Sequence, residues 1–148
     1  LEDLVLVVVD ELKDGTVGAS IVIVNDYEYE ILKQKTGLDE ASILKHSEAL
    51  IVTKGEHGST IITSDEQVNV AAVTPRRIVD PTGVGDAFRG GLMKGLGVGL
   101  PYAESAQIGS VAATYALEHL GGQSHAYALQ EFLTRYEEHF PPLSIALA

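Results

Sequence analysis

The sequence contains no cysteine and no tryptophan, and no hydrophobic run is long enough to cross a membrane. Without cysteine, disulfide bonds and thiolate zinc sites are excluded. Basic residues are scarce, because 10 lysines and arginines stand against 21 aspartates and glutamates, a formal net charge of −11. They form no cluster along one face, so neither nucleic acid nor a membrane is expected as a partner. No basic segment with a cleavage site opens the chain, and the expected location is the cytoplasm.

The 148 residues are 45% hydrophobic, which is enough to bury the core of one domain. Apolar, β-branched runs at 21–24 and 50–53 predict buried strands, and 4–9 has strand composition. Helices are expected at about 27–35, ended by Thr36-Gly37, and 40–46. Strands that alternate with helices indicate an α/β fold with a mainly parallel sheet flanked by helices.

The second half is expected to contain a hairpin and three helices. Residues 59–63 and 67–73 alternate as the strands of a hairpin around Ser64-Asp65-Glu66. One helix follows residues 80–86 and runs to about Gly95. Pro101 opens a long helix that Gly121-Gly122 ends, and a last helix covers about 129–140. The apolar positions of the long helix are Ile108, Val111, Ala112, Tyr115, Ala116 and Leu120.

The string Asp-Pro-Thr-Gly-Val-Gly-Asp at residues 80–86 carries the clearest chemical signal. Gly83 and Gly85 leave backbone N–H groups free to face an anion, and a helical pattern begins directly after them. Asp86 falls in the first helical turn, so a carboxylate lies beside any phosphate that the turn binds, which suggests phosphoryl transfer. The simpler alternative is a capped helix start, with Thr82 as N-cap and the glycines as turn residues.

Asn25 and Glu28 follow the strand at 21–24, at the strand end where α/β sheets bind ligands. An amide and a carboxylate at this spacing can hold a hydrated Mg²⁺ together with phosphate oxygens. Taken alone, the pair is better explained by ordinary helix capping by Asn25, with Glu28 as a first-turn acid, and both interpretations can hold together.

The order of three motifs resembles the ribokinase-like (PfkB) carbohydrate and nucleoside kinases. Asn-x-x-Glu at 25–28 comes first, Thr-Lys-Gly-Glu-His-Gly at 53–58 resembles the family's glycine turn, and 80–91 resembles its C-terminal signature. Within the family, residues 25–30, 35–37 and 105–112 look most like bacterial adenosine kinases. The expected fold is therefore three-layer and ribokinase-like.

This resemblance implies ATP-dependent phosphoryl transfer to a hydroxyl of a nucleoside, such as adenosine, or of a sugar. Asp86 would be the catalytic base, and the amides of Gly83, Val84 and Gly85 would stabilise charge on the phosphoryl group. The implied nucleotide contacts are Asn25, Thr53, Gly55, Gly58, Gly83, Gly85 and Ser110.

The resemblance also implies metal ions. Asn25 and Glu28 are associated with Mg²⁺, and Asp80 and Thr82 resemble a region that binds a monovalent cation such as K⁺, near Gly121-Gly122. A strand-end cap is an equal alternative for Asp80. Arg89 lies one turn after Asp86 and could reach a phosphate, although a surface arginine is as plausible. The histidines have no ligand spacing.

Members of this family are much longer, and their N-terminal half supplies a lid and the acceptor site. The chain is therefore expected to be the C-terminal, nucleotide-binding part of such a kinase domain, over residues 1–148. The acceptor stays open among adenosine, ribose and other sugars. The alternative is a fragment without turnover that binds ATP or a partner. Exposed sheet edge and helix faces would favour self-association, as a homo-oligomer, unless the N-terminal half is supplied.

Overall fold

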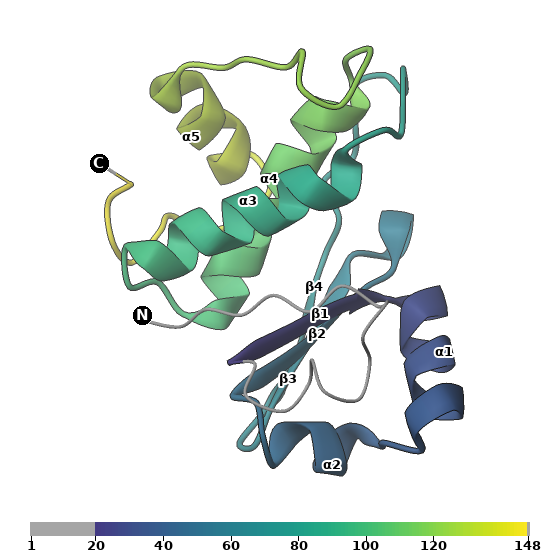
Figure 1. Ribbon diagram of the computed structural model, residues 1–148. Helices are drawn as coiled ribbons and strands as arrows, with labels where there is room; N and C mark the ends of the chain where they lie inside the picture. Colours follow the sequence, from purple (N-terminus) through teal and green to yellow (C-terminus); the bar gives the residue numbers. More distant parts are fainter. Residues whose placement is uncertain (1–19, 148) are drawn as a thin grey trace. The chain divides into compact units, whose positions relative to one another are not determined.

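A four-stranded sheet in the order β1-β2-β3-β4 carries the first part of the chain (Figure 1). The computed structural model describes residues 20–147, and the chain divides between Asn69 and Val70 into two units. The strands are β1 (Ile21–Asn25), β2 (Ala49–Thr53), β3 (Ser59–Thr63) and β4 (Gln67–Val70). The segment 4–9, which has strand composition, lies outside the described residues.

The sheet is mixed. β1 and β2 are parallel, in a register that pairs Asn25 with Thr53, whereas β2 and β3 are antiparallel. The short turn at 54–58 enforces this reversal, because a parallel connection needs a longer crossover. The expected hairpin closes where the Thr63 N–H donates to the Glu66 carbonyl at 2.9 Å. β4 ends at Val70, three residues before the predicted end of that strand.

In the first unit, the first helix ends and the second helix begins where the sequence predicts. α1 (Asp26–Thr36) stops at Gly37, which adopts a left-handed backbone (φ 68°) and donates its N–H to the Lys33 carbonyl. α2 (Glu40–Leu44) begins after Asp39, whose carboxylate accepts the Ser42 N–H at 2.8 Å. α2 is two residues shorter than the predicted helix at 40–46.

One face of the sheet packs against α1 and α2 and forms the core of the first unit. Leu32 of α1 and Ile43 of α2 are fully buried against it. The sheet residues of this core are Val22, Val24, Leu50, Val52 and Ile62. The continuous apolar runs of β1 and β2 thus form buried strands, as predicted.

The second unit is helical and consists of α3 (Val84–Gly97), α4 (Tyr102–Leu117) and α5 (Leu129–Glu137). α3 and α4 lie side by side and approach closely through small residues (Figure 1). A Cβ atom on Gly91 would lie 2.8 Å from the Gly109 Cα, and one on Gly95 would lie 2.7 Å from the Ser105 hydroxyl. Only glycine fits this contact between the two helices.

The predicted apolar stripe of α4 is buried, with one exception. Tyr115 of α4 packs with Phe132 and Tyr136 of α5. Burial raises the pKa of Tyr136 to about 12, and its hydroxyl donates to Gln107 Oε1. Leu120 was expected on the same stripe, which is wrong: α4 ends at Leu117, and Leu120 is 75% exposed in the turn that follows.

Candidate active site

Asn25 and Glu28 form a reciprocal capping box at the junction of β1 and α1. The Glu28 N–H donates to Asn25 Oδ1 at 2.7 Å, and the Asn25 N–H donates to Glu28 Oε2 at 2.8 Å. The capping interpretation of this motif is therefore confirmed. Asn25 is exposed and Glu28 is half-buried, and Oε1 of Glu28 has no hydrogen-bond partner among the described residues.

The glycine turn at 53–58 lies beside this capping box in the same sheet, because Thr53 pairs with Asn25. Gly55 (φ 56°) and Gly58 (φ 79°) both adopt backbone conformations that favour glycine, and they flank the short helical turn η2 (Gly55–His57). The Lys54 ammonium donates to Thr60 Oγ1 at 2.7 Å. The first unit thus brings together two of the three motifs.

The third motif, the 80–86 loop, is tied to the turn after α4. Asp80 accepts the Thr82 N–H at 2.9 Å on one carboxylate oxygen and the Gly121 N–H at 2.9 Å on the other. Hydrogen bonds from Thr82 and Gly121 hold the pKa of Asp80 below its usual range. Asp80 therefore joins two loops, and its neighbourhood to Gly121 and Gly122 agrees with the sequence expectation.

Gly83 is the N-cap of α3, and its backbone is left-handed (φ 77°). A Cβ atom here would lie 2.6 Å from the Gly122 Cα, so the two loops touch backbone to backbone. No side chain caps the helix, and the first helical hydrogen bond runs from the Ala87 N–H to the Gly83 carbonyl. The alternative in which Thr82 is the N-cap is wrong, and the N-terminal amides of α3 are left without a side-chain acceptor.

Asp86 lies in the first turn of α3, as predicted, and its side chain is 84% exposed. Arg89, one turn later, donates from Nη1 to Asp86 Oδ1 at 2.9 Å. A negative charge here is favoured by the helix dipole as well as by Arg89. The first turn of α3 thus combines amides that no side chain caps with an accessible carboxylate, and one of these amides, that of Val84, donates to the Pro81 carbonyl at 3.4 Å.

Ser110 lies inside α4 and is buried, and its hydroxyl donates to the Ala106 carbonyl at 3.1 Å. Its predicted contact with a nucleotide base stays a prediction. Among the residues that the structure describes, no group of three histidine, aspartate or glutamate side chains is arranged to hold a metal ion. Within residues 20–147, no helix is long and apolar enough to span a membrane.

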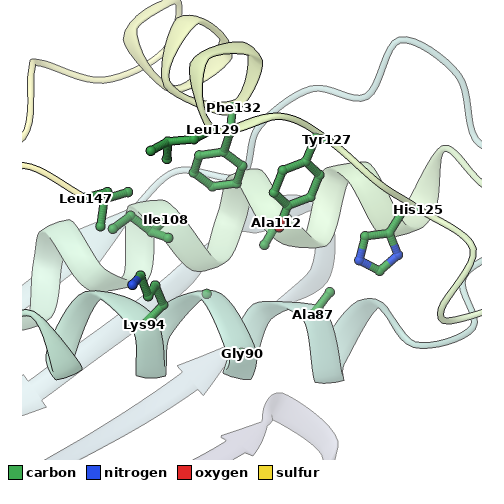
Figure 2. Close-up of a pocket in the computed structure, with 11 residues that line it drawn as sticks. Ala87, Gly90, Lys94, Ile108, Ala112, His125, Tyr127, Leu129, Phe132 and Leu147 are labelled. Carbon is green, nitrogen blue, oxygen red and sulfur yellow. The ribbon is translucent and has the colours of Figure 1, made fainter.

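A cavity of about 400 Å³ opens in the second unit between α3, α4 and the loop before α5 (Figure 2). Ala87, Gly90 and Lys94 of α3 line one side, and the aromatic rings of Tyr127 and Phe132 line the other. None of the predicted site residues lines this cavity. Its walls are mostly apolar, and they also include the titratable side chains of Lys94 and His125.

The sequence analysis did not predict the buried ion pair between Glu118 and Arg135, which contacts the segment preceding the 80–86 loop. The carboxylate of Glu118, just after α4, accepts two hydrogen bonds from the Arg135 guanidinium, at 2.6 and 2.7 Å, and also the Arg76 N–H at 2.6 Å. Arg135 also lies over the Tyr115 ring. One signal was present, since an acidic residue at the C-terminal end of a helix opposes the helix dipole and needs a partner.

Comparisons with known proteins place these motifs in context. Residues 4–128 match the family model described as pfkB family carbohydrate kinase. The chain is 28% identical over 120 residues to a nucleoside kinase of Methanocaldococcus jannaschii, covering 81% of this chain and 40% of that protein. It is 37% identical over 92 residues to an inositol 3-kinase of Arabidopsis thaliana, covering 59% of this chain and 26% of the relative.

Solved structures similar to this chain also include nucleoside kinases. The Burkholderia thailandensis nucleoside kinase in complex with inosine superposes with a TM-score of 0.84 at 39% identity, over 87% of this chain and 42% of that one. The same kinase has been solved in complex with ADP-inosine. The M. jannaschii nucleoside kinase, an archaeal member of the ribokinase family, superposes with a TM-score of 0.79.

These matches show the α/β, ribokinase-like fold that the sequence indicates. The chain spans about 40% of the length of the first nucleoside kinase relative and of the matched nucleoside kinase structures. Since the family model covers most of the chain, the chain belongs to the pfkB family of carbohydrate kinases.

Proposed function

We propose that this chain is the nucleotide-binding and catalytic part of a kinase that transfers the γ-phosphoryl group of ATP to a hydroxyl of a nucleoside or sugar. The observation that carries the proposal is the N-terminus of α3, where no side chain caps the amides and the exposed carboxylate of Asp86 lies in the first turn. Such a terminus binds an anion, and the carboxylate supplies a base next to it.

In the proposed reaction, the acceptor oxygen attacks the γ-phosphorus while the bond to the ADP oxygen breaks. Asp86 takes the hydroxyl proton, and a carboxylate of ordinary basicity is sufficient because the proton leaves late in a loose transition state. The amides of Gly83, Val84 and Gly85 stabilise negative charge on the phosphoryl oxygens. Arg89 holds the Asp86 carboxylate through the 2.9 Å hydrogen bond described above.

The capping box of the first unit has one side-chain oxygen that could hold a hydrated Mg²⁺. Asn25 Oδ1 and Glu28 Oε2 are engaged by backbone N–H groups, which leaves Oε1 of Glu28 to accept a water molecule of a hydrated Mg²⁺. The ion would neutralise phosphate charge. We therefore propose that Glu28 and Asn25 act indirectly, and that Thr53, Gly55, Gly58 and Ser110 contact the nucleotide.

A monovalent cation such as K⁺ at Asp80 and Thr82 is a further part of the proposal. Both Asp80 oxygens already accept N–H groups, so such an ion would depend on the backbone carbonyls of the two joined loops.

For the acceptor, we propose a nucleoside, with adenosine ahead of ribose and other sugars. Support comes from the nucleoside kinase relatives and from the inosine bound to the B. thailandensis protein. A cytoplasmic location and the lack of a nucleic-acid partner remain predictions that rest on the sequence and its charge of −11.

The test is ATP consumption by the complete natural protein with adenosine, inosine and ribose, each compared with the Asp86→Asn variant. We expect turnover to fall by about 10²–10⁴-fold in this variant, since the base is lost. The matched control is Asp65→Asn in the exposed hairpin turn, which should leave turnover unchanged. Equal turnover of Asp86→Asn and the wild type would refute the role of Asp86. Tight ATP binding without turnover on any acceptor would favour a binding module.

Tyr127 and six other large hydrophobic side chains are exposed among the described residues. The other six are Tyr27, Ile78, Val79, Leu120, Leu129 and Ile145. We propose that residues 1–148 alone self-associate and that the rest of a kinase domain prevents this. Light scattering of the isolated chain tests this point, and a monodisperse monomer would refute it.

A further inference from the structure

The segment 71–83, which connects β4 to α3, contains no helix and no strand. Its position therefore depends on contacts with other parts of the second unit. It carries Asp80 and Gly83 and leads directly into the first turn of α3. Whatever fixes this segment also fixes the 80–86 loop.

The contacts of this segment follow one side of α4 and the turn after it. The Val73 carbonyl accepts the Thr114 hydroxyl at 3.3 Å, and the Leu117 carbonyl accepts the N–H groups of Val79 and Asp80 at 2.9 and 3.2 Å. The Asp80 carboxylate then accepts the Gly121 N–H. The partners on α4 and its turn are three to four residues apart, so they form a continuous stripe.

Glu118 lies in the middle of this stripe, and its carboxylate contacts both the segment and α5. Its Oε1 accepts the Arg76 N–H at 2.6 Å and also Nη2 of Arg135, while Oε2 accepts Nη1 of Arg135. The guanidinium thus holds both carboxylate oxygens and sets the orientation in which Oε1 meets Arg76.

Both members of the pair are buried, with Glu118 6% exposed and Arg135 2% exposed. A buried carboxylate needs a charged partner, and Arg135 in turn packs against the Tyr115 ring at 4.8 Å from its centroid. The carboxylate therefore cannot rotate freely, and the hydrogen bond to Arg76 is held in place from α5.

We propose that Glu118, oriented by Arg135, is a positioning residue that sets the geometry of the 80–86 loop without touching the substrate. In this proposal, Arg135 of α5 fixes the carboxylate of Glu118, and Glu118 fixes the backbone of Arg76. The position of Arg76 then restricts the segment that leads to Asp80. The catalytic consequence rests on the proposed kinase function, whereas the effect on the loop itself does not.

The experiment uses the complete natural protein and two variants, Glu118→Gln and the double variant Glu118→Leu/Arg135→Met. The double variant replaces a buried ion pair by apolar residues of similar size, an exchange that often preserves stability. It nevertheless removes the acceptor of the Arg76 N–H. The matched control is Glu104→Gln, on the same helix, whose carboxylate binds Ser144 rather than the segment 71–83.

The first readout is hydrogen exchange of peptides covering 74–84 and 117–123, which needs no activity. We expect exchange at least about 10-fold faster in the double variant at unchanged melting temperature, and no change in Glu104→Gln. The second readout is kinetic: we expect KM for ATP to rise about 10-fold or more with a smaller change in kcat, because the loop binds phosphate.

Three outcomes would overturn the proposal. The first is wild-type exchange in a folded double variant. The second is unfolding of both Glu118 variants, which makes the pair a requirement for folding rather than for loop position. The third is the same acceleration in Glu104→Gln. If the wild-type protein lacks kinase activity, the exchange readout still decides whether Glu118 positions the loop.

Discussion

A carboxylate lies in the first turn of the helix that follows β1, and another lies in the first turn of α3. The chain around the two helix starts is held by different kinds of contact. At β1, Asn25 and Glu28 bind each other's backbone across three residues. At α3, Asp80 binds Gly121 across 41 residues, and behind it Arg76 binds Glu118 across 42. The first is a local cap that forms with its helix, whereas the second exists only when the second unit is folded.

Removing one member of the buried pair should have the largest effect on stability. Arg135→Met leaves Glu118 buried and unpaired, which is expected to cost about 3–5 kcal/mol. The control is Lys33→Met, because Lys33 and Glu30 form a pair of similar length, 2.5 against 2.6 Å, on the surface of α1. We expect no measurable loss there. Urea unfolding measures the free energy of unfolding of both variants. Equal losses in Arg135→Met and Lys33→Met would contradict the distinction between the long-range pair and the local pair.

Gly83→Ala should have the next largest effect. The left-handed backbone alone is expected to cost about 1–3 kcal/mol, and contact with Gly122 adds to it. Gly37→Ala shares the left-handed backbone, but its Cβ would meet open space, so it should cost less. Gly85→Ala, which has neither problem, should be neutral or stabilising by up to about 1 kcal/mol. Thermal unfolding of the three variants tests this order, and a reversed order would refute it.

Acid should weaken the second unit through Glu118. The hydrogen bonds from Arg135, more than any other cause, hold the pKa of this carboxyl below its ordinary value of 4.5. A depressed pKa in the folded state means that the stabilisation is complete above about pH 4.5 and is lost as pH falls through the folded pKa. Urea unfolding of wild type and Glu118→Gln between pH 7 and 3 measures this loss, which should be smaller in the variant. Parallel curves would contradict it.

Breaking the local cap should have the smallest effect. Asn25→Ala removes the acceptor of the Glu28 N–H and is expected to cost about 1 kcal/mol, whereas Asn25→Asp, which retains a capping oxygen, should cost less. Hydrogen exchange should be faster in the first turn of α1 and unchanged at residues 80–86. A change at that loop would show that the two ends are not independent.

The same contrast explains what could be predicted from the sequence. The capping box, the Gly37 stop and the hairpin turn are encoded by residues a few positions apart, and each was found. Asp86 in the first turn of α3 was also found, because the glycines precede it directly. Leu120 was predicted wrongly because α4 ends at Leu117, and the alternative with Thr82 as N-cap was wrong because Gly83, which touches Gly122, takes that position. Glu118 and Arg135 were missed because nothing local pairs them.

The close contact between α3 and α4 constrains how this protein can change over evolution. A methyl group on Gly91 or Gly109 would already meet backbone atoms at 2.8 or 2.7 Å, so any other residue there must push the helices apart. Asp86 lies on one of these helices, and such a shift would move the carboxylate. A survey of random variants should therefore find substitutions at these glycines among those that lower the kinase activity proposed above.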